Sequence, residues 1–118
     1  MATRIETRPA SEPFDELLVL LNRTTNLRTV EVVADQLGAT HDERAIRPLL
    51  LRLGDHSVQE HRNVEGAVCR ALMALGVMGC SDDRFILRPR RDLADGVVAT
   101  IRELAGTIPW QYFGTPRF

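Results

Sequence analysis

The segment DERAIRPLLLRLG, residues 42–54, carries the clearest helical pattern of the chain. Its apolar side chains recur at intervals of three or four residues, which places them on one face of an α-helix: Ile46, Leu49, Leu50 and Leu53. Asp42 is a favourable helix N-cap, and Gly54 is a favourable stop. Because an interior proline removes a helix hydrogen bond, Pro48 predicts a kink over residues 44–48.

The same periodicity continues on both sides of this stretch and predicts further helices. Before it, the pattern covers residues 14–21, with Pro13 in the first turn, and then 27–37, with Gly38 as the stop. After it, a helix begins at residue 58 or 61 and runs to 75, a short helix covers 82–87, and a last helix covers 91–105. No segment shows a convincing strand pattern.

An internal repeat links these helices into units. Val-Ala-Asp-Gln-Leu-Gly at residues 33–38 recurs as Ala-Leu-Met-Ala-Leu-Gly at 71–76. Arg-Ala-Ile-Arg-Pro at 44–48 recurs, less closely, as Arg-Phe-Ile-Leu-Arg-Pro at 84–89. Each unit is therefore expected to be a helix, a turn and a second helix, which buries its apolar faces by stacking on its neighbours.

The repeated unit resembles the HEAT repeat, particularly the short HEAT-like type of bilin lyases and many bacterial scaffold proteins. The resemblance covers residues 34–76 and is carried chiefly by the phrase Asp-x-Arg-Ala-Ile-x-Pro-Leu-Leu at 42–50. The chain departs from the pattern at 55–63, which is longer than the usual turn, and at 88–91, where Pro-Leu-Leu is expected. The resemblance implies an all-α fold, a short α-α superhelix of about five or six helices in HEAT-like hairpins. It implies an interaction role only by analogy.

Length and composition limit the classes of function. A chain of 118 residues suits one domain, with a flexible N-terminal arm at 1–12, a repeat domain at 13–106 and an aromatic tail at 107–118. The net charge of −1 lacks the cationic field of most nucleic-acid binders. No apolar run is long enough for a membrane span, and no secretory signal is visible, so the cytoplasm is the expected compartment.

No motif points to catalysis. The spacing of His56 and His61 fits neither zinc-protease signature, and no phosphate-binding loop or nucleophile elbow is present. All 15 basic residues are arginine, so no lysine is available for Schiff-base chemistry. Cys69 and Cys80 have no matched histidine and are expected to be free thiols. We therefore expect a protein that is not an enzyme and carries no metal or cofactor.

The tail holds four of the six aromatic residues of the chain, within nine positions: Trp110, Tyr112, Phe113 and Phe118. Aromatic side chains bury large areas and are enriched at interface hot spots. The tail is expected to fold back over the last helices as a cap, or to dock on a partner protein or on a second copy of the chain. The last arrangement would give a homodimer.

The proposed partner is another protein, bound by the outward residues of the second helices of the hairpins and by the four tail aromatics. The helix positions combine both charges, which suits recognition by complementarity: Arg28, Glu31, Asp35, Arg62, Glu65, Arg70 and Met73. This predicts a protein-interaction or scaffold module. Two alternatives are an accessory subunit of an enzyme complex, as in bilin lyases, and nucleic-acid binding through the arginines at 84, 88, 90 and 91, which neighbouring aspartates would partly neutralise.

Overall fold

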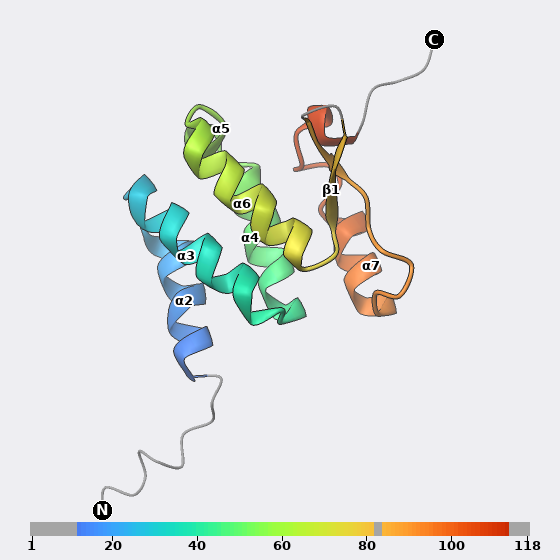
Figure 1. The fold of residues 1–118 in the computed structure, drawn as a ribbon, viewed down its shortest axis with the longest axis horizontal. Coiled ribbons are helices and arrows are strands. Elements are labelled where there is room, and N and C mark those ends of the chain that lie inside the picture. The colour runs from blue at the N-terminus through green and yellow to red at the C-terminus, as the bar shows by residue number, and fades with distance from the viewer. Residues whose placement is uncertain (1–11, 82–83, 114–118) are drawn as a thin grey trace, which may run out of the picture.

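A computed structural model describes residues 12–81 and 84–113, and this part of the chain is mostly helical, as the sequence predicts (Figure 1). The helices and strands follow in this order: α2 (Glu12–Arg23), α3 (Leu27–Thr40), the 3-10 turn η1 (Glu43–Ala45), α4 (Ile46–Leu53), α5 (His56–Gln59), α6 (Arg62–Ala74), β1 (Met78–Ser81), β2 (Arg84–Leu87), α7 (Asp95–Glu103) and the 3-10 turn η2 (Trp110–Phe113). The predicted N-terminal arm lies outside the described residues, apart from Glu12, which begins α2.

The helices form two stacked hairpins. Helices α2 and α3 pack against each other, and α4 packs against α6. The second helices of the two hairpins, α3 and α6, then lie side by side, with α2 and α4 behind them (Figure 1). Helix α7 contacts α4, and β1 contacts α6, so the C-terminal part of the chain continues the stack.

The core follows the predicted apolar stripes. The large side chains without solvent exposure include Leu21 of α2, Leu37 of α3, Leu50 of α4 and Leu72 of α6. The apolar face of α6 is buried from Val64 to Leu72, and Gly66 and Cys69 are buried as well. Among the described residues, no polar or charged residue is buried, so the interior is held together by apolar packing.

Gly38 has a different role from the predicted helix stop. Helix α3 continues to Thr40, and its C-cap is His41 in the left-handed conformation, with φ of 56°. A Cβ atom on Gly38 would lie 2.8 Å from the Cα of Ala71 on α6. Because no real Cβ contact is that short, Gly38 is the position that lets α3 and α6 approach closely.

The segment around Pro48 also differs from the sequence prediction. Asp42 caps the turn η1, since its Oδ1 accepts a hydrogen bond from the Arg44 backbone N–H at 3.0 Å. The α-helix starts only at Ile46, so Pro48 is its third residue. The first residues of an α-helix have no intrahelical partner for their N–H groups, so the proline costs no hydrogen bond there. The predicted kink is instead a change from 3-10 to α-helix at residues 45–46.

Arg52 joins the two hairpins. Its Nε donates to the carbonyl of Leu21 at 2.8 Å, and its Nη2 donates to the carbonyl of Thr24. Its Nη1 pairs with Asp55 Oδ2 at 2.7 Å. Because carbonyls at the end of a helix lack intrahelical partners, the α4 guanidinium satisfies the C-terminal end of α2 and its following turn.

The helix predicted over 82–87 is wrong for residues 84–87, which form a strand, whereas residues 82 and 83 lie outside the described residues. Strand β1 pairs antiparallel with β2, from Met78 opposite Leu87 to Ser81 opposite Arg84. Two hydrogen bonds extend the pairing toward α6, from Arg88 N–H to the Val77 carbonyl and from Arg90 N–H to the Gly76 carbonyl, both at 2.8 Å. Glycine at 79 and a proline at 89, which favours an extended residue before it, disfavour a helix here.

The third unit therefore differs from the first two. The repeat at 84–89 lies in β2 and the loop after it, whereas its counterpart at 44–48 lies in η1 and α4. Helix α7 begins at Asp95 rather than at 91, and Leu93, Val97, Ile101 and Leu104 are buried. The C-terminal unit is a hairpin of strands followed by one helix. Within residues 12–81 and 84–113, no helix is both long and apolar enough to cross a membrane.

Candidate interaction surface

The predicted partner-binding residues of α3 and α6 lie on exposed or half-buried positions. Glu31 and Glu65 are half-buried, and five others are exposed: Arg28, Asp35, Arg62, Arg70 and Met73. Asp35 and Arg70 link the two helices through an ion pair of 3.8 Å between Oδ1 and Nη2, in which both side chains are more than half exposed. An exposed pair of this kind contributes little stability, so both charges stay available to a partner.

Two shallow hollows flank this ion pair along the seam between α3 and α6. The first, of about 420 Å³, lies where both helices begin and is lined by residues that include Arg28, Glu31 and Arg62. The second, of about 150 Å³, lies where both helices end, and its lining includes Asp35, Arg70 and His41. We call this surface the α3–α6 face and define it by Arg28, Glu31, Asp35, Arg62 and Arg70.

Glu65 is not grouped with the α3–α6 face. It lines a third hollow, of about 330 Å³, which also includes Arg62 and is bounded by β2 and η2. We call this hollow the α6–β2–η2 pocket; its lining includes Arg62, Glu65, Arg84, Phe85, Gln111 and Tyr112. The sequence prediction grouped Glu65 with Arg70; in the structure Glu65 lines the α6–β2–η2 pocket, and Arg70 lines the second hollow between α3 and α6. Met73 lines none of the three hollows described here.

The predicted tail begins with a segment that folds back onto its own chain. Ile108 and Tyr112 are buried, and the Tyr112 hydroxyl donates a hydrogen bond to Glu65 Oε2, 47 positions away in sequence. Phe113 is exposed to 48%. Ile108 and Tyr112 therefore pack against the rest of the chain. Trp110 begins η2, and Phe118 lies outside the described residues.

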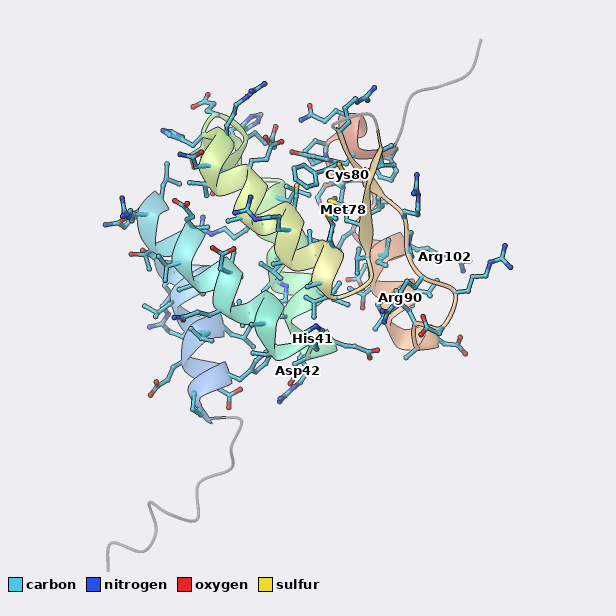
Figure 2. The ribbon with its side chains drawn as sticks, viewed as in Figure 1. His41, Asp42, Met78, Cys80, Arg90 and Arg102 are labelled. Carbon is cyan, nitrogen blue, oxygen red and sulfur yellow. The ribbon has the colours of Figure 1, made fainter. Side chains whose placement is uncertain are left out.

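Both cysteines are free thiols, as predicted, and they lie in different surroundings. Cys80 is exposed on β1 (Figure 2). Burial, with a smaller effect from the negative charge of Glu65, raises the pKa of Cys69 to about 12. Burial and the hydrogen bond to Glu65 raise the pKa of Tyr112 above its usual value. Cys69 is therefore protonated at neutral pH, and it lacks the thiolate that a nucleophile needs.

Two of the arginines near β2 lie in different surroundings. Arg84 faces the α6–β2–η2 pocket. Arg90 packs against Gly76, where an added Cβ would lie 2.6 Å from the Arg90 Nε. The Arg90 Nε also forms an ion pair with Asp92 Oδ1 at 3.2 Å. Within the predicted cluster, the charge of Arg90 is thus paired with an aspartate.

His61 serves local structure at the start of α6. His61 precedes α6 as its N-cap residue, and its Nδ1 lies 2.8 Å from the Ser57 carbonyl. Over residues 12–81 and 84–113, no group of three or more His, Cys, Asp or Glu side chains is placed to hold a metal ion.

Sequence reasoning missed Phe85 and Gln111 as site residues. They join Arg62 and Glu65 in one pocket only because β2 and η2 fold against each other beside α6. The residues are separated by 20 to 50 positions, approximately, and share no periodic pattern that would connect them. An excess of aromatic residues in the tail was the only signal that this region packs on the rest of the chain.

Comparisons of the chain with protein families, curated protein sequences and solved structures found no significant match.

Proposed function

We propose that the protein is a small, non-enzymatic interaction module of the HEAT-like type, which binds another protein across the α3–α6 face. One observation carries the proposal: the second helices of two stacked hairpins lie side by side and bring charges of both signs to the rim of one shallow seam. A surface of alternating charge selects a partner by electrostatic complementarity more than by buried apolar area.

The form of the seam supports protein binding over catalysis. Its two hollows are open, and the groups around them are mostly solvent-exposed charges such as Arg28, Asp35 and Arg70. Catalytic sites instead place perturbed acids, bases or nucleophiles in a sheltered cleft. The stacking of α2–α3 on α4–α6 also agrees with the HEAT-like phrase at 42–50.

The test is affinity purification of the tagged full-length chain from its native host, followed by binding measurements with the purified partner. The face variant carries Arg28→Glu and Arg62→Glu, and its matched control carries Arg47→Glu and Arg102→Glu. Both variants change the net charge by the same amount. Arg47 and Arg102 are exposed on α4 and α7, and Arg102 lies at the α7 end of the molecule, away from α3 (Figure 2).

We expect one partner at a fixed ratio with the wild type and the control. The face variant should weaken its binding by at least about tenfold, since close interfacial charge pairs couple by more than about 1.4 kcal/mol. The identity of the partner then shows whether the module is a scaffold or an accessory enzyme subunit. Recovery of the chain with itself only, or equal loss of binding in both variants, would contradict the proposal.

A further inference from the structure

Helix α2 lies at one end of the stack and carries a stripe of exposed residues, on the side away from its buried residues Phe14 and Leu21 (Figure 1). Val19 is exposed to 49% and Leu20 to 46%, and a charged residue lies on either side of them along the helix. The spacing of i, i+3, i+4 and i+7 places all four on one helix face. We call them the α2 stripe, which consists of Glu16, Val19, Leu20 and Arg23.

An exposed apolar pair is unusual at the end of a helical stack. The terminal unit of a repeat protein generally needs a polar outer face, because an apolar one promotes association. Helix α2 packs on α3 and α4 with its inward face, and this packing leaves Val19 and Leu20 about half exposed. The two side chains are therefore available to a second molecule.

The charges of the α2 stripe are complementary to the stripe itself. Glu16 and Arg23 lie two helical turns apart, about 10 Å along the axis, which is too far for them to pair with each other. The ion pairs within residues 12–81 and 84–113 use neither side chain. The midpoint between these two residues falls between Val19 and Leu20. A two-fold axis through this midpoint would put Glu16 of each copy opposite Arg23 of the other.

We propose that two copies of the chain associate through an antiparallel contact between their α2 stripes. Val19 of each copy packs against Leu20 of the other, and the two equivalent ion pairs fix the direction and register of the helices. A parallel contact would put like charges opposite each other, so the charges also select against it. A contact between two helices is smaller than a standard interface, so the dimer is weak and reversible.

The dimer goes beyond the proposed protein-binding function. The α3–α6 face contains none of the stripe residues, so each dimer carries two such faces and suits a partner with repeated sites. Self-association is measured on the purified chain alone, whereas the proposed function is measured with the partner. Failure of one proposal is therefore distinguishable from failure of the other.

The experiment is sedimentation equilibrium of the purified full-length chain, from about 10 µM to about 1 mM, the range expected for a weak interface. We expect a reversible equilibrium between monomer and dimer. The combined variant Val19→Ala and Leu20→Ala should weaken it by at least about tenfold, since apolar burial is lost while alanine favours the helix. The control Phe113→Ala removes a side chain exposed to 48% on η2, far from α2 (Figure 1), and should change it by less than about twofold.

Two charge variants that repel themselves and attract each other test the register of the contact. Glu16→Arg places arginines opposite each other, and Arg23→Glu places glutamates opposite each other, so each alone should dimerise at least about tenfold more weakly. Mixed in equal amounts, they restore both ion pairs and should associate within about threefold of the wild type. The matched controls Asp95→Arg and Arg102→Glu reverse exposed charges at the same spacing on α7, and they should dimerise as the wild type does.

Circular dichroism at the helix band shows that each variant is folded. Monomers at every concentration would overturn the proposal and would assign the α2 stripe to another occupant, residues 1–11 of the same chain or a different protein. A dimer that the alanine variant leaves unchanged, or that Phe113→Ala weakens equally, would overturn it as well. So would a mixture of the two charge variants that associates no better than each variant alone.

Discussion

Replacement of Gly38 by alanine tests whether the α3–α6 contact depends on the absence of a side chain. The new Cβ would lie 2.8 Å from the Cα and 3.0 Å from the Cβ of Ala71. The first contact is with backbone, so it cannot be relieved by a side-chain rotation, and the helices must move apart. Overpacking of this kind costs about 1–3 kcal/mol. Alanine is favoured over glycine inside a helix by about 0.5–1 kcal/mol, which offsets only part of the cost.

We therefore expect Gly38→Ala to lower the free energy of unfolding by about 1–2 kcal/mol. Gly96→Ala is the matched control, because Gly96 lies in the first turn of α7 and a Cβ there meets no atom within 4 Å. The control should be neutral or stabilising by up to about 1 kcal/mol.

The assay is urea unfolding followed by circular dichroism at the helix band, with the stability taken from the transition midpoint at an unchanged slope. The two substitutions are chemically identical, so general helix propensity favours both. A Gly38→Ala protein as stable as the Gly96→Ala protein would refute the close-approach argument. A loss of more than about 4 kcal/mol in the free energy of unfolding would also refute the argument, because the estimate assumes that α3 and α6 can move apart slightly to accept the new Cβ.

Three further predictions concern other features of the fold. Arg52→Ala should lower the free energy of unfolding in urea by about 3 kcal/mol, because charge-assisted hydrogen bonds to the end of α2 and the following turn are lost. The control Arg47→Ala, at an exposed position, should lower it by less than about 1 kcal/mol. Equal losses in the two variants would contradict a joining role for Arg52. At pH 8, iodoacetamide should modify the exposed Cys80, while Cys69, with its pKa raised to about 12 by burial, should react only after unfolding. Mass spectrometry of the peptides measures the modification of each cysteine. Modification of both cysteines in the folded protein would contradict the packing of α6. Hydrogen bonds from the Ser57 side chain and backbone, with a further contribution from Arg52, lower the pKa of Asp55. The ionised Asp55 therefore stabilises the fold above its unfolded pKa of about 4, and this stabilisation is lost as the pH falls through the folded pKa. Asp55→Asn should flatten the loss of stability below about pH 4, and an unchanged dependence of stability on acid pH would contradict the stabilising role of Asp55.

Local patterns predicted much of the helical part of the chain. The spacing of apolar residues predicted the inward faces of α2, α3, α4, α6 and α7, because apolar residues recur every three or four positions along each helix. The same reasoning identified Asp42 as a cap and Gly54 as a helix stop. It missed the start of α7 by four positions, since Leu93 is buried without being helical.

The prediction was least accurate where structure depends on distant partners. Residues 84–87 resemble a helical segment in sequence but form a strand, because they form hydrogen bonds with β1 that a local sequence pattern cannot predict. Gly38 has the sequence appearance of a helix stop, and its actual role depends on Ala71 of another helix. Exposed positions on α3 and α6 were predicted from periodicity, but their division between two surfaces was not.

Residue types and short-range spacing were enough to predict a mostly helical chain, the inward face of each main helix and the scarcity of catalytic motifs. Tertiary structure alone decided that Glu65 contacts Tyr112 rather than facing the seam with α3. It also decided that arginines from α6 and β2 share one pocket. Such groupings arise from the packing of segments far apart in sequence, and no period along the chain encodes which of them will meet.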